Sequence, residues 1–252
     1  MTKGVNICNR FLDLVPIYVE RWFWLLSISG DSIFARMIQD GFRQQGLRAR
    51  LVQELRRKEA GNERVWEAMQ RVPRHLFLDT SFGQFAYRDV AFPIGAGQTI
   101  SQPSTVARQT ALLGAEPGQR ILEVGTGSGY QAAVLAELGV ELYSIERQAA
   151  LYSSTRGLLQ QLGYQGIKLF LGDGYEGLPR EAPFDGILVT AGAAVLPQEL
   201  LRQLKVGGLM VVPLGAKVQT MTRIRRLSEN DFEQETFGEC AFVPMLGGIV
   251  RR

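Results

Sequence analysis

The stretch from Glu123 to Gly129 combines a carboxylate with a glycine at every second position from Gly125 onward. It continues a short apolar run that begins at Ile121, of the kind that forms a buried parallel strand, and a helical pattern starts at Tyr130. A strand, a glycine turn and a helix form the first unit of a nucleotide-binding α/β fold, because glycine allows positive φ and close approach to a ligand. A carboxylate at the strand end favours a cationic ligand over a pyrophosphate.

The spacing of the glycines distinguishes two kinds of nucleotide site. A dinucleotide fingerprint reads G-x-G-x-x-G, with the pyrophosphate at the helix N-terminus. This chain reads E-x-G-x-G-x-G, and Tyr130 stands where the last dinucleotide glycine would be. The pattern resembles motif I of S-adenosylmethionine-dependent methyltransferases, whose cofactor carries a sulfonium and an ammonium group. An ordinary glycine-rich turn between a strand and a helix is the alternative.

Further carboxylates lie at the ends of the following predicted strands. Glu146 ends the second strand, where a carboxylate can accept both ribose hydroxyls. Asp173 ends the third strand, placed to meet an adenine amino group, and Gly174 allows close approach. Asp185 precedes the fourth strand and is interpreted as structural. Because ligands of such sheets bind beyond the carboxyl ends of the strands, these acids together favour a nucleoside site over isolated surface charges.

A second candidate site precedes the glycine motif. Residues 79–102 show no clear period and are interpreted as a long loop with short strands, which inside a compact domain is usually functional. Pro103 suits the first turn of a helix that runs to about Leu113. Ser101 and Gln102 are therefore expected at a helix N-terminus, where free backbone N–H groups can hold an anion. Alternatively, one of the two side chains only caps the helix.

Alternation of strand and helix patterns from Arg120 onward predicts the elements that position these residues. It indicates the α/β class with a doubly wound, mostly parallel sheet, preceded by an N-terminal helical extension. Strands are expected at 121–124, 142–145, 167–171, 186–190 and 209–212, and helices at 130–138, 149–162 and 197–204. Two β segments near 220–226 and 241–245 are expected to complete the sheet as a hairpin-like edge, and helices are expected at 32–59 and from an Asn62 cap to Arg71.

The composition limits the class of protein. The chain has 252 residues and a formal net charge of +3, which fits one α/β domain with an appendage and argues against a dedicated nucleic-acid surface. Cys8, Cys240 and the single histidine, His75, provide neither a disulfide framework nor a metal site, so no metal is expected. His75 is interpreted as structural. A reducing cytoplasm is the expected location.

The N-terminal residues 12–28 are rich in apolar and aromatic side chains. No run of about 20 apolar residues could span a membrane, because charges interrupt the segment at Asp13, Glu20 and Arg21. The segment also lacks a clean signal-peptide pattern. It is interpreted as an accessory helix or as a translated upstream segment before a start at Met37, with a membrane-surface helix as the alternative.

Longer blocks of the chain resemble protein-L-isoaspartate O-methyltransferases. The resemblance covers roughly residues 46–247, which predicts an N-terminal extension, residues 1–45, and a methyltransferase domain, residues 46–252. The matching blocks are Val72-Pro73-Arg74, Pro93-Ile94-Gly95, Gln98 to Pro103, Leu122 to Tyr130, Gly172-Asp173-Gly174, Pro183-Phe184-Asp185, Val189-Thr190-Ala191 and Gly207 to Gly215. The block Thr99-Ile100-Ser101-Gln102-Pro103 is specific to this family. The chain departs from it at Ala191-Gly192-Ala193-Ala194, where Ala-Ala-Pro-like residues are expected.

The resemblance implies a methyl transfer from S-adenosylmethionine to the free α-carboxyl of L-isoaspartyl residues in damaged proteins and peptides. The resulting ester then collapses to a succinimide that reopens partly to aspartate. Ser101 matches the family's active-site serine. The matching cofactor residues are Glu123, Gly125, Thr126, Gly127, Glu146, Asp173 and Gly174, and the matching substrate residues are Thr99, Ile100, Gln102 and Gln219. The expected enzyme is a cytoplasmic monomer without nucleic-acid or membrane partners.

The implied chemistry agrees with a chain that contains a single histidine, because it needs no general base. A carboxylic acid has a pKa near 4, so the acceptor is already ionised at neutral pH and needs no general base.

Two alternatives remain at this point: another Rossmann-like methyltransferase that acts on tRNA or a small molecule, and a non-catalytic binding protein with the cofactor fold. The basic run Arg223 to Arg226 is short and is interpreted as the solvent side of an edge strand rather than a tRNA-binding face.

Overall fold

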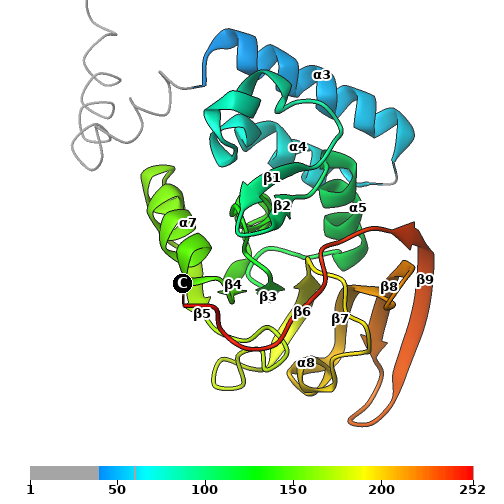
Figure 1. Cartoon of the computed structure of the whole chain (residues 1–252). Coiled ribbons are helices and arrows are strands. Elements are labelled where there is room, and N and C mark those ends of the chain that lie inside the picture. Colours follow the sequence, from blue (N-terminus) through cyan, green and yellow to red (C-terminus); the bar gives the residue numbers. More distant parts are fainter. Residues whose placement is uncertain (1–39, 60, 252) are drawn as a thin grey trace, which may run out of the picture. The chain divides into compact units, whose positions relative to one another are not determined.

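The computed structural model of the chain describes residues 40–59 and 61–251 (Figure 1). The predictions for the N-terminal segment, including Cys8, the apolar residues 12–28 and a start at Met37, lie outside the described residues. The helices are α3 (Phe42–Lys58), α4 (Glu63–Arg71), α5 (Pro103–Leu113), α6 (Tyr130–Ala136), α7 (Ala149–Gln161) and α8 (Gln198–Arg202), with the 3-10 helices η1 (Arg74–Phe77) and η2 (Thr80–Phe85). Among the described residues, none of these helices has the length and apolar character needed to cross a bilayer.

A sheet of seven strands confirms the predicted α/β class. Its order is β5-β4-β3-β6-β7-β8-β9, parallel from β5 through β7 and antiparallel at β8 and β9. The chain adds β4 and β5 on one side of β3 and then returns to the other side with β6, so the strand order reverses between β3 and β6. The strands are β3 (Arg120–Val124), β4 (Glu141–Glu146), β5 (Lys168–Leu171), β6 (Phe184–Val189), β7 (Leu204–Leu214), β8 (Gln219–Arg226) and β9 (Phe232–Cys240).

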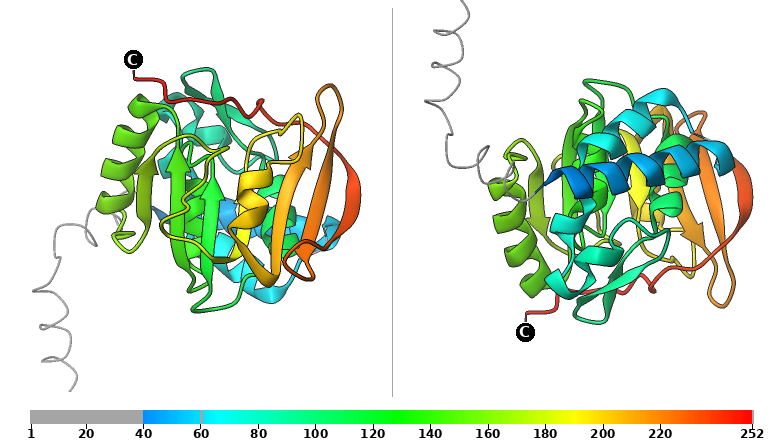
Figure 2. Two further views of the ribbon diagram at one scale, coloured as in Figure 1. Left: turned by 90° about the horizontal axis from the view of Figure 1, so that it is seen from below. Right: turned by 90° about the horizontal axis from the view of Figure 1, so that it is seen from above.

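Alternate residues of the central strands enter two separate hydrophobic layers. Ile121 and Leu188 pack with residues of α3 to α7 on one face, whereas Leu122 and Ile187 pack with α8 on the other. Figure 2 shows α8 in front of the sheet in the left view and α3 in front in the right view. A separate two-stranded ribbon, β1 (Phe92–Gly95) and β2 (Gln98–Ile100), precedes α5.

At the end of the chain, one predicted strand was too short and another was wrong in position. The strand predicted at 209–212 lies within β7, which begins at Leu204 because pairing with β6 resumes after an irregularity around Gly207, whose φ is 85°. The last strand is β9, residues 232–240, and not the predicted 241–245. β9 is an edge strand whose side chains are mostly polar and exposed, so it carries no apolar alternation that the sequence could reveal.

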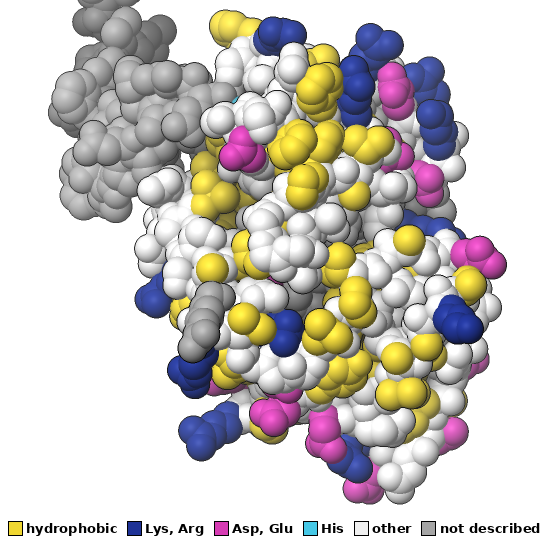
Figure 3. Space-filling model, in the orientation of Figure 1, with side chains coloured by type: hydrophobic (Ala, Val, Ile, Leu, Met, Phe, Trp, Pro, Cys, Tyr) yellow, Lys and Arg dark blue, Asp and Glu magenta, His cyan; other side chains and the backbone are white. Residues whose placement is uncertain are grey.

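Among the described residues, α3 begins at Phe42, later than the predicted start at residue 32, and α4 occupies the predicted range. Asn62 caps α4, and its side chain accepts from the backbone N–H of Val65 at 3.0 Å, as predicted. Lys and Arg side chains gather over α3 in Figure 3, consistent with a solvated basic face. Arg48 is the exception, since it is buried and pairs with Asp40 at 2.9 Å. The helix also spans the predicted domain boundary after residue 45.

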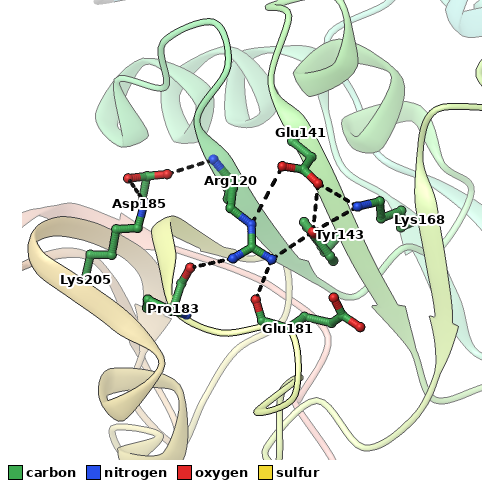
Figure 4. Close-up of polar contacts among 8 residues, drawn as sticks. All are labelled: Arg120, Glu141, Tyr143, Lys168, Glu181, Pro183, Asp185 and Lys205. Carbon is green, nitrogen blue, oxygen red and sulfur yellow. Dashed lines mark hydrogen bonds and ion pairs between the residues drawn. The ribbon is translucent and has the colours of Figure 1, made fainter.

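A cluster of charges ties the amino ends of the parallel strands together (Figure 4). Arg120, the first residue of β3, donates to the hydroxyl of Tyr143 at 2.8 Å and to the carbonyl of Glu181 at 2.7 Å. Lys168, the first residue of β5, donates to Tyr143 at 2.9 Å. Asp185 accepts from the backbone N–H of Arg120 at 2.8 Å and pairs with Lys205, which confirms its structural interpretation.

Candidate active site

A cavity lies at the carboxyl ends of the strands, next to the point where the strand order reverses between β3 and β6, as expected for this sheet type. The residues before α5, the glycine loop 125–129 and the ends of β4 and β6 form its walls. Residues 241–251, here called the C-terminal strap, run across this edge of the sheet (Figure 2, left). The strap contributes four residues to the cavity: Val243, Pro244, Met245 and Leu246.

The glycine loop lies too close to its neighbours to carry side chains at two positions. Gly125 has φ 101°, and an added Cβ would stand 2.5 Å from the hydroxyl oxygen of Thr190, at the end of β6. That hydroxyl donates to the carbonyl oxygen of Gly125 at 2.6 Å. Gly129 has φ 86°, and a Cβ there would lie 2.8 Å from Thr155 of α7. The two glycines therefore let the loop pack against β6 and α7 while its backbone forms the cavity wall.

Glu146 lies at the cavity and holds the glycine loop from the end of β4. It is 5 % exposed. One carboxylate oxygen accepts from the N–H of Gly127 at 2.9 Å, and the other accepts from the N–H of Gln148 at 2.8 Å. A carboxylate has about four acceptor positions, so capacity for further hydrogen bonds remains on both oxygens. The side chain can therefore fix the loop and still accept hydroxyl groups of a ligand.

Glu123 lies beneath the loop and does not line the cavity. It is fully buried, and one of its oxygens accepts from the hydroxyl of Ser144 at 2.5 Å. The other oxygen has no hydrogen-bond partner. Ser144 in turn shares a hydrogen bond of 2.6 Å with Thr126, which does line the cavity. Burial raises the pKa of Glu123 to about 8, because it disfavours the charged carboxylate.

Ser101 lines the cavity together with Thr99 and Ile100, immediately before α5. The structure does not support the alternative that Ser101 or Gln102 caps this helix. Gln102 is the N-cap residue, but its side chain makes no capping bond and donates to the hydroxyl of Ser104 instead. The helix terminus is also less free than expected, because the N–H of Ser104 donates to the carboxylate of Asp89 at 2.8 Å.

Two predicted ligand residues hold the C-terminal strap. Asp173 accepts from the backbone N–H groups of Tyr175 and Gly248, at 2.8 and 2.5 Å, and does not itself line the cavity. The amide of Gln219 both accepts from and donates to the backbone of Phe242, at 2.7 and 3.1 Å. Arg147 adds hydrogen bonds of 3.0 Å to the carbonyl oxygens of residues 247 and 248. These side chains fix the strap over the cavity.

The structure thus brings most of the predicted site residues together. Those that line the cavity are Thr99, Ile100, Ser101, Gly125, Thr126, Gly127, Glu146 and Gly174, whereas Gln102, Glu123, Asp173 and Gln219 do not. His75 is outside the cavity and its Nδ1 lies 2.8 Å from the hydroxyl of Tyr87. Sequence reasoning missed the strap, which carries no motif, and Arg147, whose position directly after Glu146 was the available signal.

Comparisons with known proteins agree with this site. The family described as protein-L-isoaspartate(D-aspartate) O-methyltransferase matches residues 46–249. A protein-L-isoaspartate O-methyltransferase of Flavobacterium psychrophilum is 53% identical over 209 residues, which cover 83% of this chain and 98% of that protein. The relative from Syntrophus aciditrophicus is 45% identical over 213 residues, covering 83% and 97%.

Solved structures show the same fold. A protein-L-isoaspartate O-methyltransferase structure superposes with a TM-score of 0.74 at 28% identity, covering 80% of this chain and 67% of that one. A Plasmodium falciparum structure, described as a putative protein-L-isoaspartate O-methyltransferase in complex with S-adenosyl-L-homocysteine, gives 0.69 at 23% identity, covering 79% and 98%. The extent of these matches identifies the chain as a member of the protein-L-isoaspartate(D-aspartate) O-methyltransferase family.

Proposed function

We propose that this protein repairs damaged proteins by transferring a methyl group from S-adenosylmethionine to the free α-carboxyl of L-isoaspartyl residues. One observation carries the proposal: the residues of the family-specific block, Thr99 to Ser101, and the glycine loop line the same cavity. Family membership over residues 46–249 supports the same activity. No general base is needed, because the acceptor carboxyl is ionised at neutral pH.

The walls of the cavity fit the cofactor chemically. Glu146 has acceptor capacity for ribose hydroxyls, and the glycine loop allows close approach of the backbone. Ile145, Val243 and Met245 add apolar surface that suits a planar base. We assign cofactor binding to Gly125, Thr126, Gly127, Glu146 and Gly174 by direct contact, and to Glu123 and Asp173 through the groups that they hold.

Bound S-adenosylmethionine supplies an electrophilic methyl group whose carbon–sulfur bond breaks as the substrate carboxylate oxygen forms the ester. The residues of this chain orient the carboxylate and exclude water. Ser101 is placed to donate its hydroxyl to the carboxylate, and Thr99 and Ile100 form the adjoining wall. The C-terminal strap covers the cavity, which favours a reaction between an anion and a cation because their charges shrink toward the transition state.

Four further features belong to the proposal. The methyltransferase domain comprises residues 46–252, with residues 1–45 as an extension. The enzyme acts in the cytoplasm as a monomer, without nucleic-acid or membrane partners. Gln219 contributes to substrate binding by holding the strap through Phe242. Gln102, which is exposed next to Ser101, contacts the substrate outside the cavity.

A pair of peptides that differ only in one linkage tests the proposal. The purified protein is incubated with labelled S-adenosylmethionine and either an L-isoaspartyl peptide or its normal aspartyl twin. We expect methyl incorporation into the isoaspartyl peptide alone. Equal labelling of both peptides, or labelling of tRNA in place of either, would assign the protein to a different methyltransferase activity.

A further inference from the structure

Arg74 is fully buried directly behind the wall of the cavity. It begins η1, and its side chain is 0 % exposed, which is rare for arginine. The guanidinium donates to the carbonyl oxygen of Ser101 at 2.8 Å and to those of Ala86 and Val90 at 3.0 and 3.3 Å. It also stands over the ring of Tyr130, 4.8 Å from the ring centroid. Both Ser101 and Tyr130 line the cavity.

The positive charge of Arg74 is not neutralised by an ion pair within the part of the chain that the structure describes. Burial lowers the pKa of Arg74 to about 10, against the opposing influence of Tyr130, Asp89 and Tyr87, and the group stays cationic at neutral pH. Its Nη1 has no hydrogen-bond partner. Arg48 provides a contrast, because it is 6 % exposed and pairs with Asp40 at 2.9 Å.

A buried charge without an ion pair is unfavourable, and carbonyl hydrogen bonds offset only part of its desolvation. Neutral side chains could fill the same space, so packing alone does not require a charge at this position. Asp89, which accepts from the N–H of Ser104, attracts the Arg74 charge but forms no ion pair with it. An anion that binds in front of Ser101 would add a counter-charge, and the proposed substrate presents its carboxylate there. Because the medium between the two charges is protein rather than water, their attraction is weakly screened.

We propose that Arg74 is a positioning residue that selects an ionised substrate carboxylate: its charge attracts the anion, and its hydrogen bond holds the backbone of Ser101. This inference rests on the proposed function. The substrate's negative charge is largest in the ground state and falls in the transition state. The positive charge therefore stabilises the bound substrate at least as much as the transition state, so its loss should raise KM with little effect on kcat.

The test compares the isoaspartyl peptide with the same peptide whose α-carboxyl is amidated. The amide cannot be methylated on that carboxyl and serves as a neutral competitive inhibitor. The ratio of its Ki to the KM of the carboxylate peptide measures how strongly the site prefers the charge. Arg74→Gln removes the charge while it keeps an amide donor, and Arg74→Lys keeps the charge. Arg48→Met is the matched control, since it removes another buried arginine that does not contact Ser101.

We expect Arg74→Gln to raise the KM of the carboxylate peptide on the order of tenfold and to leave the Ki of the amide within about twofold, so that the ratio collapses. Arg74→Lys should recover most of the preference, and Arg48→Met should keep the wild-type ratio even if its melting temperature falls. Equal changes of KM and Ki in Arg74→Gln would reduce Arg74 to a structural role and overturn the inference.

If Arg74→Gln does not fold, Arg74→Lys tests whether the charge selects the carboxylate. The ratio of the Ki of the amidated peptide to the KM of the carboxylate peptide is then measured over a pH series. The buried ammonium of this variant should lose the proton, and with it the preference for the carboxylate, at a lower pH than the wild type does. A wild-type-like pH dependence of the ratio would overturn the inference. Failure of the wild type to methylate the isoaspartyl peptide would instead refute the proposed function.

Discussion

Ser101 is the residue on which the proposed chemistry depends most. Ser101→Ala should lower kcat and raise the KM of the isoaspartyl peptide, because one donor to the substrate carboxylate is lost, while the affinity for S-adenosylhomocysteine stays nearly unchanged. Loss of one such donor costs about 10²–10³ in rate where charge builds up in a transition state. Here the charge falls, so the expected loss in kcat is smaller.

Ser104→Ala is the matched control for this experiment. Ser104 lies three residues further along, at the start of α5, and its hydroxyl accepts from Gln102 without lining the cavity. Steady-state kinetics and thermal melts of both variants should show a kinetic defect only for Ser101→Ala. Wild-type kinetics of folded Ser101→Ala would exclude Ser101 from the reaction.

Glu146 offers a second prediction at the scale of the residue. Glu146→Gln should weaken binding of S-adenosylhomocysteine by about tenfold or more, because hydrogen bonds to a charged group contribute roughly 1.5–3 kcal/mol. Glu141→Gln is the control, since Glu141 begins the same strand at the opposite edge of the sheet. Isothermal titration calorimetry measures both. Equal affinities for the two variants would place the ribose elsewhere.

The buried carboxyl of Glu123 predicts a pH dependence of stability. Its pKa is raised from 4.5 to about 8 by burial, so the folded protein keeps the proton where the unfolded chain has lost it. Below about pH 4.5 the Glu123 carboxyl is neutral in both the folded and the unfolded chain, so its burial does not lower stability. Between about pH 4.5 and about 8 the free energy of unfolding then falls, by roughly 1.4 kcal/mol per pH unit at most.

Glu123→Gln removes this titration and keeps the size of the side chain. Urea unfolding at pH 5, 6.5 and 8.5 should show that wild type loses stability relative to the variant as the pH rises. Two curves that run parallel from pH 5 to 8.5 would mean that Glu123 is ionised in the folded protein.

At the scale of the element, the amino ends and the carboxyl ends of the parallel strands carry different groups of residues. The charged cluster around Tyr143 lies at the amino ends of β3, β4 and β5 (Figure 4). The cavity lies at the carboxyl ends of these strands. Tyr143→Phe should lower the free energy of unfolding by about 1 kcal/mol, because Arg120 and Lys168 keep their other partners.

Denaturant unfolding and methylation kinetics on one preparation of Tyr143→Phe test this separation. We expect a lower urea midpoint and unchanged kcat and KM. A loss of activity in folded protein that exceeds about threefold would show that the charged cluster at the amino ends of the strands is energetically coupled to the cavity at their carboxyl ends.

The sequence predicted elements best where an apolar pattern was present. The strands ending at Val124 and Glu146 were correct because parallel strands buried on both faces read as apolar runs. β9 was missed because its polar edge residues carry no such pattern. The strap could not be predicted either, since its position depends on long-range hydrogen bonds from Gln219, Arg147 and Asp173.

The same limit applies to individual side chains. Glu146 and Ser101 reach the cavity as predicted, because the ends of the elements that carry them converge there. Whether a strand-end acid faces the cavity or lies beneath it depends on the side-chain contacts around it. Thus Glu123 is held by Ser144 under the loop. The burial of Arg74 likewise follows from three backbone carbonyls that are distant in sequence.

At the scale of the whole molecule, two hydrophobic layers enclose a sheet, and the glycine loop, the family-specific block and the strap meet at the carboxyl ends of its parallel strands. The hydrogen bonds of the charged cluster lie at the opposite ends of the strands from the cavity. The proposed function is decided by which chemical group receives the methyl group.

The most direct measurement follows one reaction mixture that contains labelled S-adenosylmethionine and equimolar isoaspartyl, aspartyl and α-amidated isoaspartyl peptides. Mass spectrometry and mild alkaline treatment then identify which peptide carries the methyl group and whether it is an ester. The proposed function predicts a base-labile methyl ester on the isoaspartyl peptide alone, followed by accumulation of its succinimide and aspartyl forms. A methyl group on the amidated peptide, or one stable to alkali, would contradict it.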